Sequence, residues 1–345
     1  MAESYHKDAE AKLVTKLRGL QRELPIFTAE LFRGIADYTS VQTRVAYAYD
    51  LKIFFSYLSE DVCHKNIRDF TVGDLAALKS DDIQAFLEYL TYYVKEDETT
   101  IQNDAQGKSR KLAAVRTMFK YFYGKGKLPA NPAELVGFPK LREKNIITLE
   151  IDEIAKLLDM VESGDKLTSK QQQYHERTKV RDIAIITLLL GTGMRVSECV
   201  GLNIQDIDFE TGGVLVTRKG GDQMVLYFGD EVSYALKNYL SMRKNVTAKE
   251  DHENALFLSM QNRRITERAM QNLVKKYSAL VTSLKNISPH KLRSTFGTRL
   301  YQETQDIYLV ANVLGHADVN TTRKHYAKMD DDQRRRAANA VKLRE

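Results

Sequence analysis

The sequence predicts a mainly α-helical protein with one small antiparallel sheet, divided into two domains. Three observations support this fold class. Apolar residues recur at helical spacing along most of the chain. Alternating apolar residues occur at 213–217 and 223–228, and the glycines between them suit a hairpin turn. The length of 345 residues favours two domains over one.

The first part of the chain is predicted to be helical. Residues 1–35 carry leucines at helical spacing, and a further helix from Ser40 is expected to place Tyr49 on its core-facing stripe. Another helix is expected over 81–95. The acidic stretch 96–100 is predicted to be a loop.

The charge of the chain changes sign after residue 107. Between Lys108 and Lys144, ten Lys and Arg residues accompany only two acids. An ordinary solvated surface mixes both signs, so this excess favours contact with phosphates. Aromatic residues at 119 and 121–123 lie among them and are expected mostly in the core. The basic residues assigned to this contact are Lys108, Arg110, Lys111, Arg116, Lys140 and Arg142.

A linker is predicted at 138–146, which contains a proline and lacks apolar periodicity. It separates a first domain, 1–137, from a second, 147–345. In the second domain the polar stretch 162–179 is expected to be an exposed loop or a helix extension. Helices are predicted there over 149–161, with Ile151 inward, and over 182–190, 230–244, 266–284, 289–303, 307–314, 321–328 and 331–342.

Composition narrows the class of protein. The net charge of +6 modestly favours a nucleic-acid partner. No run of 18 apolar residues exists, so no membrane association is expected. The first residues lack the layout of a signal peptide, which predicts a cytoplasmic protein. Cys63 and Cys199 lie far apart and outside any metal-ligand spacing, and Cys199, in a helical apolar pattern, is expected to be a small buried hydrophobe.

Residues capable of chemistry gather in a few short motifs. Arginine offers a rigid fork of donors for phosphate, lysine and histidine move protons, and tyrosine can form a covalent intermediate. No carboxylates cluster as a metal would require, so side-chain cations are expected to replace a metal, and no cofactor is expected. The motifs are Gly-Thr-Gly-Met-Arg-Val-Ser-Glu (191–198), Arg-Lys-Gly (218–220), Pro-His-Lys-Leu-Arg (289–293), Leu-Gly-His (314–316) and Thr-Thr-Arg-Lys-His-Tyr (321–326).

These motifs, in this order, resemble those of the tyrosine recombinase/integrase (phage-integrase) family, and most of all its Xer-like and mobile-element members. The resemblance covers roughly residues 35–345. It implies a C-shaped clamp, in which a SAM-like helical core-binding domain and an α+β catalytic domain close on double-stranded DNA. It also implies a site-specific recombinase that works through a 3′-phosphotyrosine intermediate and a Holliday junction. Such enzymes form homo-tetramers on specific DNA sites and are expected to be monomers or weak oligomers when free.

The resemblance assigns the phosphate-binding and acid roles. Arg195 and Arg293 would clamp the scissile phosphate, and Glu198, one helical turn after Arg195, would orient that arginine. Two basic residues compete for the role of general acid to the leaving 5′ oxygen, and composition does not choose between them. The resemblance selects Lys219 over Arg218, because Lys219 stands just before a glycine and 24 residues after Arg195.

The remaining catalytic roles follow the same resemblance. His290 shares a helix face with Arg293 behind a cap at Ser288, and would transfer a proton or donate a hydrogen bond. His316 would donate to a nonbridging phosphate oxygen, and Tyr326 would be the nucleophile. His316 and Tyr326 are ten residues apart where many family members have nine, which leaves the helix register open.

Two further expectations concern DNA and assembly. Thr43, Arg44 and Tyr47 match the first core-binding helix of the family and are assigned to DNA contact. The tail, 330–345, is predicted to be a helix whose thin apolar stripe docks on a neighbouring protomer, giving a cyclic tetramer. Packing within its own chain, or fraying, is the alternative.

Two other functions share these motifs. A type IB topoisomerase-like enzyme would use the same chemistry, but this chain is short, has Xer-like motif order and carries the tail. A non-catalytic DNA-binding regulator could keep the fold, but all six catalytic positions are filled. The motifs leave open the target DNA, accessory proteins, and the choice among integration, excision, inversion and dimer resolution.

Overall fold

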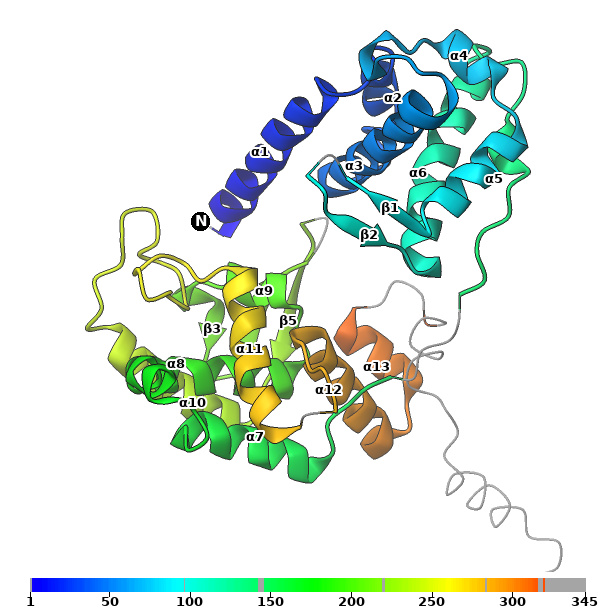
Figure 1. Cartoon of the computed structure of the whole chain (residues 1–345). Helices are drawn as coiled ribbons and strands as arrows, with labels where there is room; N and C mark the ends of the chain where they lie inside the picture. The colour runs from blue at the N-terminus through cyan, green and yellow to red at the C-terminus, as the bar shows by residue number, and fades with distance from the viewer. Residues whose placement is uncertain are drawn as a thin grey trace, which may run out of the picture. The chain divides into compact units, whose positions relative to one another are not determined.

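The computed structural model describes residues 2–95, 97–141, 146–218, 221–282, 284–315 and 319. The chain divides into two compact units, Glu3–Lys144 and Asn145–Glu345. Helices predominate, and two small antiparallel sheets, of two and three strands, occur within the described residues (Figure 1). The prediction of a mainly helical chain with little sheet is therefore confirmed.

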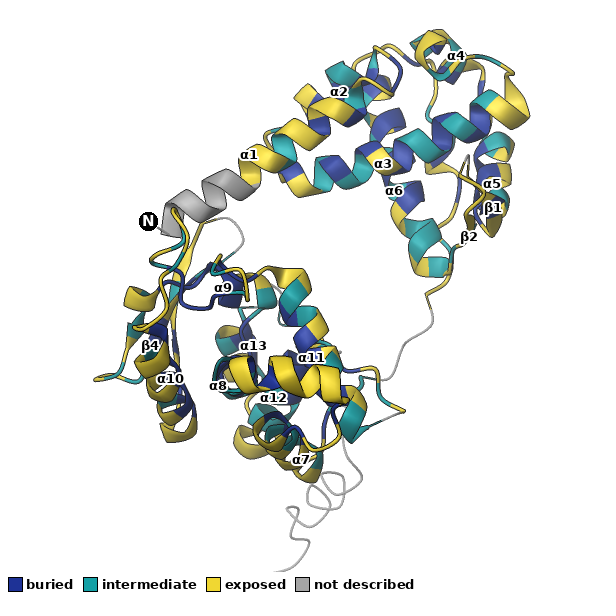
Figure 2. Ribbon diagram, turned by 60° about the vertical axis from the view of Figure 1, so that its left-hand side comes forward, coloured by how far each residue is buried: buried dark blue, intermediate teal, exposed yellow. Residues whose placement is uncertain are grey.

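The first unit is a helical domain built around α3 and α6. Both helices carry many buried residues (Figure 2) and pack against each other. Phe119 and Phe122 of α6 are fully buried. Its elements are α1 (Ala2–Gln21), α2 (Thr28–Gly34), α3 (Val41–Tyr57), a π turn (Leu58–Val62), a 3-10 turn (Ile67–Asp69), α4 (Val72–Ala77), α5 (Ser80–Tyr89), β1 (Tyr92–Val94), β2 (Thr100–Gln102), α6 (Ala105–Gly124) and a 3-10 turn (Pro132–Glu134).

Side-chain caps fix where the two central helices begin. The Ser40 hydroxyl accepts the Thr43 N–H at 3.2 Å before α3, and the Asp104 carboxylate accepts the Gly107 N–H at 2.9 Å before α6. Each cap satisfies one of the backbone donors that a helix start leaves unpaired.

Two expectations for this unit are wrong. The helix predicted over 81–95 ends at Tyr89, and the chain then forms the β1–β2 hairpin, in which Tyr92 lies opposite Gln102. Strands of three residues carry too few alternations to be distinguished from a helix end. Tyr49 is 43% exposed, because the buried side of α3 runs through Val45, Ala48 and Leu51 and leaves Tyr49 at its edge.

The second unit surrounds the long helix α8 with other helices and a three-stranded sheet of order β3-β4-β5. In β4 and β5, Val214 lies opposite Leu226, and both are buried. The elements are α7 (Ile151–Ser163), α8 (Ser169–Thr192), α9 (Val196–Gly201), a 3-10 turn (Ile204–Asp206), β3 (Ile207–Asp208), β4 (Gly213–Thr217), β5 (Gln223–Tyr227), α10 (Asp230–Arg243), α11 (Glu267–Val281), α12 (Pro289–Thr304) and α13 (Ile307–Leu314).

Of the two alternatives for the polar stretch 162–179, the structure shows the helix extension over 169–179. These residues belong to α8, which starts at Ser169 behind a capping box: the Thr168 N–H donates to Gln171 Oε1 at 3.0 Å, and the Gln171 N–H donates to the Thr168 hydroxyl at 3.4 Å. Ile151, expected inward, is 69% exposed because it is the first residue of α7.

A buried polar network ties α8 to α11. The Tyr277 hydroxyl donates to Asp182 Oδ2 at 3.0 Å and lies 3.0 Å from His175 Nδ1, while Arg181 pairs with Asp182 Oδ1 at 2.7 Å. Burial raises the pKa of Tyr277, so its hydroxyl stays protonated and remains a donor. The network fixes α8, whose far end leads into the first arginine motif.

Across the described ranges, no helix combines the length and the apolar character needed to cross a membrane.

Candidate active site

Arg195 is placed by a sharp reversal of the chain. Gly193 caps the end of α8 in the left-handed region, with φ of +62°, and a Cβ there would lie 2.3 Å from the Phe296 ring of α12. Only glycine fits both the backbone angle and this close approach. The chain then leaves α8, and Arg195 becomes the N-terminal cap of α9.

Glu198 holds Arg195 at two points. Its carboxylate accepts the Arg195 backbone N–H at 2.7 Å and the Arg195 Nη1 at 2.7 Å. The Glu198 side chain is 3% exposed, whereas that of Arg195 keeps 36% exposure. A buried carboxylate thus fixes one edge of the guanidinium and leaves part of it accessible to an anion.

Arg293 lies deeper than Arg195. It sits in the second turn of α12 and is 4% exposed. Its Nη1 donates to the Gly193 carbonyl at 2.7 Å, and its Nη2 donates to the Leu314 carbonyl. His290, three residues earlier on α12, is exposed. The structure therefore brings the second arginine to the turn that carries the first.

Three arginines converge on the C-terminal end of α13. Arg195 Nη2 donates to the Gly315 carbonyl at 3.2 Å, Arg293 Nη2 to the Leu314 carbonyl, and Arg218 Nη2 to the Val313 carbonyl at 3.1 Å. Carbonyls at a helix end have no partner within the helix and carry its partial negative charge. Three cations from separate elements are thereby gathered at one place.

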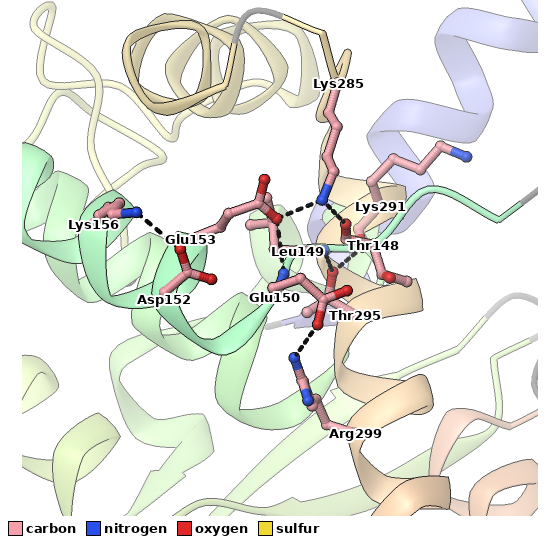
Figure 3. A network of polar contacts seen from close by, with 10 residues as sticks. All are labelled: Thr148, Leu149, Glu150, Asp152, Glu153, Lys156, Lys285, Lys291, Thr295 and Arg299. Carbon is pink, nitrogen blue, oxygen red and sulfur yellow. Dashed lines mark hydrogen bonds and ion pairs between the residues drawn. The ribbon is translucent and has the colours of Figure 1, made fainter. Parts of the chain in front are cut away.

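A polar network fixes α12 to the start of the unit (Figure 3). The Leu149 N–H donates to the Thr295 hydroxyl at 3.0 Å, and Arg299 Nη2 donates to Glu150 Oε2 at 3.0 Å. Lys285 donates to the Thr148 carbonyl at 3.0 Å and pairs with Glu153 of α7. These contacts position the helix that carries His290 and Arg293.

Several of the expected site residues lie outside the described residues, namely Lys219, His316, Tyr326 and Arg142. The same holds for the helix expected at 321–328 and the tail helix at 330–345.

The first unit holds most of the expected DNA-contact residues. Thr43, Arg44 and Tyr47 are partly exposed on α3. One helical turn further, the fully buried Asp50 pairs with Arg110 of α6, whose side chain is 51% exposed. Burial raises the pKa of Asp50 to about 6, although the charges of Arg110 and Lys111 oppose this rise. Asp50 therefore fixes an arginine that still reaches solvent.

The other basic residues of the run differ in what they offer. Lys111 is buried, with its ammonium donating to Asn103 Oδ1 at 2.7 Å, so it supports the interior of the unit. Lys108 is partly exposed and donates to the Thr91 hydroxyl at 2.7 Å. Arg116 lies over the Phe138 ring, 4.8 Å from its centroid, and Lys140 is exposed.

The model of the phage integrase family matches residues 148–333, which include the three arginines and the helices that hold them. The chain belongs to the phage integrase family. Among curated relatives of this integrase chain is a tyrosine recombinase XerC from Caldanaerobacter subterraneus subsp. tengcongensis, 34% identical over 87% of this chain and 81% of the relative. A tyrosine recombinase XerS from Streptococcus equi subsp. zooepidemicus is 30% identical over 93% of this chain and 97% of the relative.

Solved structures agree on the fold of this integrase. The XerH site-specific recombinase bound to difH, in a pre-cleavage complex, has a TM-score of 0.63 at 22% identity, covering 89% of this chain and 81% of that one. The Tn1549 transposon integrase in complex with a circular-intermediate DNA has a TM-score of 0.65 at 18% identity, and the match covers 91% of this chain and 98% of that one. The predictions of a tyrosine recombinase fold and of a site-specific, DNA-rejoining recombinase are confirmed.

The structure adds one residue that sequence analysis did not include in the site. The sequence offers Arg218 only as a rival to Lys219, because its approach to α13 depends on a contact with a residue 95 positions away. The one local signal was its place next to the lysine of the hairpin.

Proposed function

We propose that this integrase performs site-specific recombination through a covalent bond between Tyr326 and the 3′ phosphate of the cut strand. The observation that carries the proposal is the meeting of Arg195 and Arg293 at one turn, with buried Glu198 fixing the first. Two guanidiniums held at one place form a site for a phosphate whose charge grows in the transition state.

The proposed step transfers one phosphoryl group without net loss of a phosphodiester. The Tyr326 oxygen attacks phosphorus and passes its proton to His290, while the bond from phosphorus to the 5′ oxygen breaks. Lys219 supplies a proton to that leaving oxygen. Arg195 and Arg293 neutralise the nonbridging oxygens, and His316 donates a hydrogen bond to one of them. A 5′ hydroxyl from a second strand reverses the step and leads through a Holliday junction.

The two units would divide the work. We assign DNA binding to residues 1–137 and catalysis to 147–345, joined by the linker 138–146 as a clamp on double-stranded DNA. The proposed contacts to DNA retain the partly or fully exposed residues of the first unit and drop Lys111, whose ammonium is engaged in the interior. They are Thr43, Arg44, Tyr47, Lys108, Arg110, Arg116 and Lys140, to which the proposal adds Arg142, which lies outside the described residues.

The active assembly would be a homo-tetramer on two DNA sites, formed when the tail helix of one protomer docks on the next. The apolar side chains of α12 and α13 support this proposal, because several are only partly buried in their own chain and Tyr308 is 72% exposed. Apolar side chains that their own unit covers only in part suit contact with a protein partner. Because the substrate is DNA, we place the enzyme in the cytoplasm.

The test is covalent trapping on nicked suicide DNA that carries candidate sites flanking the gene. Wild type and the control Tyr234→Phe, which alters an exposed tyrosine on α10, should each yield an adduct that survives denaturation. Tyr326→Phe should yield none while still binding DNA.

Other outcomes would change the assignment. An adduct that persists in Tyr326→Phe would move the nucleophile elsewhere. Tight specific binding with no adduct in any protein would indicate a regulator. Relaxation of supercoiled DNA without a special site would indicate a topoisomerase-like enzyme.

A further inference from the structure

Arg218 links the β4–β5 hairpin to the end of α13. Its backbone belongs to the hairpin turn, because its N–H donates to the Asp222 carbonyl at 2.7 Å and its carbonyl accepts the Gly221 N–H at 3.0 Å. Its side chain leaves the hairpin, and Nη2 donates to the Val313 carbonyl at 3.1 Å. One residue thus joins two segments that are far apart in the sequence.

The Arg218 guanidinium contacts both the Val313 carbonyl and Gly315 at the end of α13. Gly315 caps the helix with φ of +63°, and a Cβ on this residue would lie 1.8 Å from Arg218 Nη1. The guanidinium therefore packs directly on the glycine backbone while bonding the carbonyl two residues earlier. A side chain at position 315 would displace the Arg218 guanidinium, because its Cβ would overlap the guanidinium atoms.

Partial burial of the Arg218 guanidinium is unfavourable, and a surface arginine with no structural contact would avoid it. Arg218 is half-buried, and its Nε is buried without a hydrogen-bond partner among the described residues. Burial lowers the pKa of Arg218, as does the charge of the nearby Arg195, while Glu198 opposes this effect. An arginine has a long flexible stem and would reach solvent unless the contact with α13 held it.

We propose that Arg218 is a positioning residue that anchors the β4–β5 hairpin to the C-terminal cap of α13, and so holds Lys219 in place to protonate the leaving 5′ oxygen. The inference rests on the proposed function, in which Lys219 is the general acid. Lys219 directly follows Arg218, whose side chain contacts Val313 and Gly315, so the contact anchors the chain one residue before the acid.

A positioning role fits the contacts of Arg218 better than phosphate binding does. One of its terminal nitrogens bonds a carbonyl, the other packs on Gly315, and its Nε is buried. Arg195, by contrast, keeps a side chain that is 36% exposed. Loss of Arg218 should thus impair the donation of a proton to the leaving oxygen and leave phosphate binding largely intact.

The expected effects follow from geometry. Arg218→Ala should slow cleavage by roughly 10- to 100-fold, the usual cost of misplacing a catalytic group by about an ångström. Arg218→Lys can still reach the Val313 carbonyl but cannot cover Gly315, so it should recover part of the rate. DNA affinity should change by less than about threefold in both variants.

The deciding experiment compares two suicide substrates, one ordinary and one with sulfur replacing the bridging 5′ oxygen at the cut. A 5′ thiolate leaves without needing a proton, because thiols have a pKa of about 8.5, whereas an alcohol leaving group requires an acid. The proteins are full-length wild type, Arg218→Ala, Arg218→Lys and Lys219→Ala. Arg268→Ala, at an exposed site on α11, controls for loss of one positive charge.

The inference predicts that Arg218→Ala and Lys219→Ala are both slow on the ordinary substrate and both near wild type on the sulfur substrate, with Arg268→Ala unaffected. Rescue of Lys219→Ala without rescue of Arg218→Ala would overturn the positioning role and leave the proposed function intact. Failure to rescue Lys219→Ala would instead refute the acid role assigned to Lys219. If Arg218→Ala does not fold, the same comparison made with Arg218→Lys decides the matter.

Discussion

Replacing Glu198 by alanine removes the two hydrogen bonds that Glu198 accepts from Arg195. The cap bond to the Arg195 N–H contributes about 1 kcal/mol. The charge-assisted bond to Nη1 contributes roughly 1.5–3 kcal/mol, and the lower end applies because the Arg195 side chain is 36% exposed. The sum is about 2–3 kcal/mol. For a unit the size of Asn145–Glu345, this corresponds to a fall in Tm of roughly 4–12 °C.

Calorimetry and covalent trapping together check this prediction. We expect Glu198→Ala to lower the Tm of the second unit and to slow adduct formation by roughly 10- to 100-fold, while Glu198→Gln, which keeps one acceptor oxygen, should fall between the alanine variant and wild type. Glu162→Ala, an exposed glutamate on α7, is the matched control. If Glu198→Ala matched that control in both Tm and cleavage, the claim that Glu198 fixes Arg195 would be refuted.

Three more predictions concern other parts of the chain. Burial raises the pKa of Asp50 to about 6, so the folded state binds the Asp50 proton more tightly than the unfolded state does. The protonated carboxyl therefore contributes its full stability below about pH 4 and loses it as the pH rises through about 6, a difference of about 3 kcal/mol. Denaturant titrations across this pH range should show the difference in wild type and not in Asp50→Asn. Gly315→Ala should destabilise by more than Gly126→Ala, which has a similar φ of +68° but open space around its Cβ; equal losses of roughly 1–2 kcal/mol in chemical unfolding would mean that backbone strain alone matters. Burial raises the pKa of Cys199, and a thiol reagent applied to the native protein should label the exposed Cys63 alone, as peptide mapping would reveal.

Local patterns predicted the elements whose signals lie within a few residues. The strands β4 and β5 were placed within one residue, because alternating apolar residues flank a glycine-rich turn. The helix α13 was placed at both ends, since Gly315 ends it in the left-handed region. Periodicity alone does not locate the start of α8, because the polar residues in 169–179 carry little of it and leave a loop and a helix extension equally open, although a capping box at Thr168 marks the start.

Long-range contacts were beyond local patterns. Counting charges could not show that Lys111 points into the interior, because its partner Asn103 precedes its own helix. The motif order indicated that Arg195 and Arg293 act together, but not that both donate to carbonyls at the end of α13. Arg218 donates to a carbonyl at the same helix end, and no spacing in the sequence predicts this contact.

The most direct test of the central claim identifies the residue that is joined to DNA. Wild-type protein is trapped on a suicide substrate, the adduct is digested with protease and nuclease, and the modified peptide is sequenced by mass spectrometry. The account predicts a phosphate-linked tyrosine at Tyr326. A modification on any other residue, including the exposed Tyr308, would contradict it.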